Sequence, residues 1–122
     1  MSASRQQLGA AGEEAAAQFL RAQRYTIVAR NYRCPLGEID LVALDGRTLV
    51  FVEVKTRRGA SFGSPFDAVD PRKQRRVTRA AQHYISANRL EHRLARFDVV
   101  GVEWVDGRPL CELIQNAFDA AT

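Results

Sequence analysis

The chain has 122 residues, of which 46% are hydrophobic and 26% are charged, and its formal net charge is +4. This length and composition predict one folded domain, residues 1–122, and exclude disordered and fibrous proteins. Because no stretch reaches the roughly 18 apolar residues of a membrane span and residues 1–20 lack the apolar core of a signal peptide, we expect a cytoplasmic protein without a membrane segment.

The first predicted element is a helix. From Arg5 to Gln23, apolar or small residues recur at i, i+3, i+4 and i+7, which is typical of an amphipathic helix. Tyr25 to Tyr32 is rich in β-forming residues and predicts a strand. Asn31 and the segment from Cys34 to Gly37 predict the turn region after it.

A hairpin and a loop come next. Gly37 to Leu44 and Thr48 to Thr56 predict two strands, because the dipeptide Asp45-Gly46 between alternating runs is a strong hairpin signal. Residues 59–71, GASFGSPFDAVDP, read as a loop in which Ser64-Pro65 can begin one short helical turn.

Asp70-Pro71 predicts the start of a second helix, because an N-cap residue is followed by proline at the first helical position. Ala95 to Val105 predicts a fourth strand, and Asp106-Gly107 a turn into a short fifth strand around Leu110 to Ile114. The order α-β-β-β-α-β-β predicts an α/β fold with one mixed sheet of about five strands flanked by two helices.

The distribution of charged residues and the positions of the two cysteines bear on what the protein binds. Residues 55–96 hold 11 basic and 3 acidic side chains, which predicts a surface that binds nucleic acid. The alternative is compositional, because 16 of the 18 basic residues are arginine and a GC-rich coding sequence favours arginine. Cys34 and Cys111 lie far apart and in no metal-binding pattern, so we expect free thiols.

Charged residues interrupt the apolar run from Leu49 to Arg58. Strand alternation puts Glu53 and Lys55 on one face of their strand. On the preceding strand, it puts Asp40 on the matching face together with Glu38 and Val42. A two-residue loop at Asp45-Gly46 would place Asp40 diagonal to Glu53, and a four-residue loop would place it directly opposite.

Two close carboxylates repel each other unless a cation or a shared proton compensates. Hard divalent ions such as Mg²⁺ bind through one or two carboxylates together with phosphate and water, and a neighbouring lysine stabilises charge that develops on phosphorus. The competing interpretation is a solvated pair of surface charges on an edge strand.

These residues also carry a family resemblance. Asp40 followed by Glu53-Val54-Lys55 resembles the core motif of the PD-(D/E)xK nuclease superfamily. A wider set of segments resembles the YraN-like family of small bacterial proteins, which is similar to archaeal Holliday-junction resolvases. These segments are GEE at 12–14, RNYR at 30–33, GEIDLVA at 37–43, VFVEVKTR at 50–57 and RFDVV at 96–100.

The resemblance implies a restriction-endonuclease-like fold. It implies that Asp40, Glu53 and the backbone carbonyl of Val54 hold Mg²⁺ or Mn²⁺, with Lys55 beside the attacking water. It also implies a catalytic glutamate on the first helix, for which Glu13 is a better match than Glu14.

The resulting hypothesis is a metal-dependent endonuclease that cuts DNA, including branched or damaged DNA, and for which a homodimer is compatible with paired cuts. Phosphate contacts are assigned to the basic residues Arg57, Arg58, Arg72, Lys73, Arg75, Arg76 and Arg79. Two alternatives stay open: a catalytically silent nucleic-acid-binding module of the same fold, and a protein-interaction domain.

Overall fold

The computed structural model describes residues 5–58 and 69–120, with side chains for 9–56 and 69–120. The elements run in the order α1 (Arg5–Ala22), β1 (Thr26–Cys34), β2 (Gly37–Asp45), β3 (Thr48–Arg58), α2 (Pro71–Ala87), β4 (Ala95–Val105) and β5 (Arg108–Phe118). The predicted order is confirmed, and most of the predicted loop 59–71, including the Ser64-Pro65 turn, lies outside the described residues. No helix in the described part of the chain has the length and apolar character to cross a membrane.

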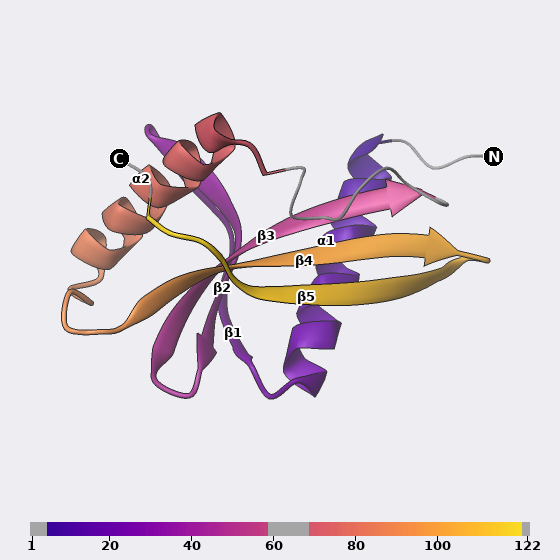
Figure 1. Cartoon of the computed structure of the whole chain (residues 1–122), viewed down its shortest axis with the longest axis horizontal. Helices are drawn as coiled ribbons and strands as arrows, with labels where there is room; N and C mark the ends of the chain where they lie inside the picture. Colours follow the sequence, from indigo (N-terminus) through magenta and orange to yellow (C-terminus); the bar gives the residue numbers. More distant parts are fainter. Residues whose placement is uncertain (1–4, 59–68, 121–122) are drawn as a thin grey trace.

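The five strands form one mixed sheet in the order β1-β2-β3-β4-β5. Neighbouring strands are antiparallel except β3 and β4, which run parallel from the pair Leu49 and Ala95 to the pair Arg58 and Trp104. Helix α2 lies in the crossover between these two strands (Figure 1). The α/β class and the mixed sheet are therefore as predicted.

Each face of the sheet packs against one helix (Figure 1). Ala16, Ala17 and Leu20 of α1 pack with Val50 and Val52 on one face. The apolar stripe of α2 packs on the other face, in a cluster whose buried members include Val42, Phe51, Val77, Ala80, Ala81, Phe97 and Val99. Asp70 caps α2, and its side chain accepts a 2.9 Å hydrogen bond from the Lys73 N–H, as the Asp-Pro signal predicts.

The fifth strand is longer than predicted. Gln115 and Asn116 look like the end of a strand, but β5 continues to Phe118, which pairs with Phe97 beyond an irregularity in the ladder. Asn116 adopts φ +51°, and its N–H donates a 2.9 Å hydrogen bond to Asp98 Oδ1. The extension therefore depends on a contact with a residue 18 positions earlier, which strand propensity alone does not reveal.

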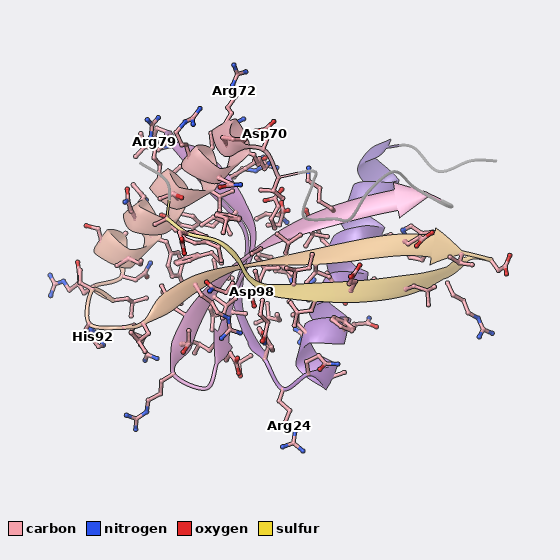
Figure 2. All side chains as sticks on the ribbon, in the orientation of Figure 1. Arg24, Asp70, Arg72, Arg79, His92 and Asp98 are labelled. Atoms are coloured by element: carbon pink, nitrogen blue, oxygen red, sulfur yellow. The ribbon has the colours of Figure 1, made fainter. Side chains whose placement is uncertain are left out.

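A buried polar network lies at the Asp45 end of the sheet and includes the RFDVV segment. Asp98 is fully buried near the centre of the molecule (Figure 2). It accepts hydrogen bonds from Arg96 Nε at 3.0 Å and from the Tyr25 hydroxyl at 3.1 Å, and Arg96 also donates to Asp45 at 2.8 Å. Because the buried charges have partners, the RFDVV segment has a structural role: it joins Tyr25, the residue before β1, to β2 and β4.

Candidate active site

Two glycines bring the helices close to the strands that carry the acidic residues. A Cβ atom on Gly37, at the start of β2, would lie 2.4 Å from the backbone oxygen of Arg76 in α2. A Cβ atom on Gly12 in α1 would lie 2.0 Å from Thr56 Oγ1 in β3. Since real side chains do not approach this closely, both positions need glycine, and these contacts bring α1 and α2 to the same end of β2 and β3.

The two strands separate where Asp40 and Glu53 lie. Their register pairs Leu44 with Leu49 and ends at the pair Leu41 and Val52, so Asp40 and Glu53 are the next residues beyond the ladder. This is the register predicted for direct opposition, although the turn contains only Gly46 and Arg47. Beyond the ladder, Asp40 Oδ2 accepts a 2.8 Å hydrogen bond from the Val54 N–H.

Side-chain alternation is interrupted at this point of β2. Ile39 and Val42 belong to the same cluster under α2, whereas strict alternation would put them on opposite faces. The prediction that Glu38, Asp40 and Val42 simply share one face is therefore incomplete. Because the Asp40 carboxylate bonds across the opening to β3, its charge acts on Glu13 from α1 as well as on Glu53.

Glu53 is the buried acidic residue of the group, with 3% of its surface exposed. Its Oε1 lies 3.2 Å from Lys73 Nζ, which reaches down from α2. Its Oε2 is also buried and has no hydrogen-bond partner among the described residues. An unpaired buried carboxylate oxygen is costly, which distinguishes Glu53 from an ordinary surface charge.

The electrostatic surroundings favour protons or cations at both carboxyl groups. Burial, followed by the nearby charge of Asp40, raises the pKa of Glu53 to about 7, against the positive charges of Lys73 and Lys55. Burial also raises the pKa of Asp40, against the hydrogen bond from Val54 and the charge of Lys73. The site thus holds two acids whose ionised forms are disfavoured unless a cation arrives.

Lys55 lies in β3 on the same site and acts on both carboxyl groups as a nearby positive charge. Lys55 and Lys73 are the two lysines of the chain, and the other 16 basic residues are arginines. Both lysines therefore lie beside the same carboxylate pair, which favours a specific role for an ammonium group over general surface charge.

Glu13 and Glu14 have different surroundings, as their positions in the helix predict. Burial and then the charge of Asp40 raise the pKa of Glu13, while a hydrogen bond with the Asn31 side chain opposes the rise. Asn31 adopts φ +51° within β1. Glu14 is exposed and pairs with Arg30 instead. Of these two glutamates, Glu13 is therefore the one whose pKa is raised by the charge of Asp40.

The donor set fits a hard divalent cation. Asp40 and Glu53 supply carboxylate oxygens from adjacent strands, and the orphaned Oε2 of Glu53 needs a positive partner. Within residues 5–58 and 69–120, no three His, Cys, Asp or Glu side chains are grouped closely enough to hold an ion by themselves. The two carboxylates match the ligands of Mg²⁺, which binds through one or two carboxylates and completes its coordination with water and phosphate.

The basic residues predicted to contact phosphate fall into three groups. Arg72, Arg75, Arg76 and Arg79 are exposed on α2, and Figure 2 shows Arg72 and Arg79 directed away from the sheet. Lys73 differs from these arginines, because it faces Glu53. The side chains of Arg57 and Arg58 lie outside the described residues.

Sequence reasoning missed two participants. Lys73 was grouped with the phosphate-binding arginines because its distance from Glu53 depends on how α2 packs, although its being one of two lysines was a usable signal. Asn31 was read as part of a turn region. Asn31 has a left-handed backbone conformation within a β-rich segment. The sequence alone does not predict this conformation, although asparagine adopts it more readily than most residues do.

The chain is similar in sequence to a family of proteins and to several of its members. The model of a family described as "Uncharacterised protein family UPF0102" matches residues 12–102. A UPF0102 protein of Symbiobacterium thermophilum is 57% identical over 93% of this chain and 97% of its own length. Similar proteins from Desulfosudis oleivorans and Moorella thermoacetica are 53% and 46% identical, over 95% and 97% of this chain and 93% and 100% of their own lengths.

Proposed function

The chain belongs to UPF0102, the YraN-like family, and from its carboxylate site we propose that it is a Mg²⁺- or Mn²⁺-dependent nuclease that hydrolyses DNA phosphodiesters. The observation that carries the proposal is Glu53, a buried carboxylate with one orphaned oxygen beside a second acid, Asp40. A buried acidic pair of this kind is expensive to maintain without a cation.

The arrangement assigns a role to each residue of the site. Asp40, Glu53 and the carbonyl oxygen of Val54 would hold the ion, which when bound would supply Lewis-acid polarisation of a phosphoryl oxygen. The Lys55 ammonium stabilises negative charge as it develops on phosphorus and orients the attacking water. Glu13, whose pKa is raised by burial and by the charge of Asp40, accepts or relays a proton from that water.

Helix α2 supplies the phosphate surface. Its exposed arginines lie on the element that packs against the start of β2 and reaches Glu53 through Lys73. Backbone phosphates held there give affinity with little sequence reading, which suits recognition of DNA shape such as branches or damage. We further propose kinship with the PD-(D/E)xK nucleases and Holliday-junction resolvases, supported by Asp40 and Glu53-Val54-Lys55 on adjacent strands.

A cleavage screen tests the proposal. Duplex, flap, four-way junction and single-stranded DNA are incubated with Mn²⁺ and either wild type, Glu53→Ala or Lys55→Met. We expect cleavage of at least one substrate by wild type, none by Glu53→Ala, and a loss on the order of 10² to 10³ in rate for Lys55→Met with DNA binding retained.

The two neighbouring glutamates provide a matched control. Glu13→Gln should slow cleavage, whereas Glu14→Gln, which removes an exposed charge paired with Arg30, should leave the rate unchanged. Salt-sensitive DNA binding with no cleavage of any substrate would favour the catalytically silent module. Absence of both cleavage and DNA binding would favour the protein-interaction domain.

A further inference from the structure

Lys73 makes an ion pair that joins the proposed phosphate-binding helix to the proposed metal ligand. Its Nζ lies 3.2 Å from Glu53 Oε1. The Lys73 side chain is 28% exposed, whereas that of Glu53 is 4% exposed, so the lysine has access to solvent and its partner has almost none. The ammonium can therefore leave the carboxylate without being buried, but the carboxylate cannot follow it into water.

Two lysines lie close to the two carboxyl groups of the site. The positive charges of Lys55 and Lys73 each favour the ionised forms of Asp40 and Glu53. A divalent ion that enters this site meets two ammonium groups in addition to its ligands. Because unit charges a few ångströms apart interact by several kcal/mol at an effective dielectric constant of about 20, removing one ammonium should change ion affinity substantially.

We infer that Lys73 is a displaceable counter-ion of Glu53, which competes with the divalent ion for the carboxylate and thereby sets the affinity of the site. This inference rests on the proposed function, since it takes Asp40 and Glu53 to be the ion's ligands. Lys55 is a poorer candidate for displacement, because it lies two residues from Glu53 in the same strand, whereas Lys73 extends from a separate element.

The position of Lys73 on α2 determines where its ammonium goes. It lies in the first turn of the helix next to the exposed Arg72, and Arg75 and Arg76 follow in the next turn. An ammonium released from Glu53 is therefore presented at the surface proposed to hold phosphate. Since coupling between two binding sites is reciprocal, DNA on α2 should strengthen ion binding and the ion should strengthen DNA binding.

Calorimetric titration with Mn²⁺ alone tests the inference without any cleavage assay. The variants are Lys73→Met, which removes the competing charge, Lys73→Arg, which keeps it, and Arg21→Met, which removes an exposed charge at the far end of α1. We expect Lys73→Met to bind Mn²⁺ about tenfold or more tightly than wild type. Lys73→Arg and Arg21→Met should stay within about twofold of wild type.

Thermal unfolding without added metal supplies a second readout. Lys73→Met should lower the melting temperature by about 5 °C, because Glu53 loses its partner, and should have little effect when Glu53→Gln is already present. This coupling shows whether the ion pair exists in solution.

The outcomes separate this inference from the proposed function. Equal or weaker Mn²⁺ binding by Lys73→Met, with clear binding by wild type, would overturn the counter-ion role and leave the metal site standing. No Mn²⁺ binding by wild type or Lys73→Met, with or without DNA, would overturn both. Equal melting shifts for Lys73→Met in the two Glu53 backgrounds would also overturn the counter-ion role.

Discussion

Glu53 is a residue whose acid-base chemistry the fold alters. Its carboxyl group has an ordinary pKa of 4.5, which burial and the charge of Asp40 raise to about 7. The folded protein therefore takes up a proton at Glu53 more readily than the unfolded chain does. The corresponding stability is fully present below pH 4.5 and is lost as the pH rises through about 7.

This shift predicts a pH-dependent difference between wild type and Glu53→Gln. The rise of the Glu53 pKa from 4.5 to about 7 corresponds to about 3 kcal/mol of unfolding free energy. Between pH 4.5 and pH 8, the unfolding free energy of wild type should therefore fall by about 3 kcal/mol relative to that of the glutamine variant. Urea unfolding at several pH values measures the difference. Glu112→Gln, at an exposed position in β5, is the control and should show no such trend. A constant difference between wild type and Glu53→Gln would contradict the shift.

Asp40 predicts a reversal of stability on metal binding. Asp40→Asn removes repulsion with Glu53 while its carboxamide oxygen still accepts the Val54 N–H, so without metal the variant should melt at the same or a slightly higher temperature. With Mn²⁺ at about ten times its Kd, wild type should gain about 1.4 kcal/mol, on the order of 5 °C, and the variant should gain less. Equal shifts in both proteins would show that Asp40 is not a ligand.

At the scale of elements, the closeness of α1 to β3 depends on Gly12. Two glycines of α1 offer a matched pair, because a Cβ atom on Gly12 would lie 2.0 Å from Thr56 Oγ1, whereas one on Gly9 would meet nothing within 4 Å. Gly9→Ala should stabilise the protein by up to about 1 kcal/mol through helix propensity. Gly12→Ala should instead destabilise it by about 1 to 3 kcal/mol, because the helix or Thr56 must shift.

Urea unfolding of the two glycine variants checks this prediction. If both variants gain the same stability, the contact between α1 and β3 is looser than the structure indicates. If Gly12→Ala is destabilised, cleavage by that variant should also fall, because Glu13 is the next residue on the displaced helix.

The elements were predictable from local sequence because their signals are local. The Asp70-Pro71 cap and the β-rich run from Ala95 to Val105 each define an element without reference to the rest of the chain. The candidate carboxylate pair was also found, since the hairpin register follows from a short turn. The Lys73 contact and the interrupted alternation near Asp40 were not, because both depend on how α2 and β3 meet β2 in space.

At the scale of the whole molecule, exposed arginines lie on more than one side of the protein. The exposed arginines of α2 lie on one side of the protein, while Arg24 points from the opposite side (Figure 2). If α2 is the nucleic-acid surface, the position of an arginine should therefore affect DNA affinity more than the net charge of the protein does.

Replacing Arg72, Arg75 and Arg76 by alanine should weaken duplex binding for unrelated sequences and reduce the salt dependence by about one unit of slope for each lost phosphate contact. The control replaces three exposed arginines elsewhere, Arg21, Arg24 and Arg108, and removes the same charge. Fluorescence anisotropy at several salt concentrations measures both. A similar loss of slope in the two triple variants would show that α2 is not the binding surface.

The single parallel junction in the sheet has a consequence for how the chain reaches its native state. Strands β1 to β3 pair through short turns, as do β4 and β5, but the β3–β4 junction joins residues 46 positions apart, such as Leu49 and Ala95. Strands this distant in sequence pair late in folding, so one edge of β3 is unpaired until β4 has been synthesised. Charged residues on such an edge deter intermolecular strand pairing. We therefore expect Glu53 and Lys55 to limit aggregation of the nascent chain, and Glu53→Ala to refold in lower yield as protein concentration rises.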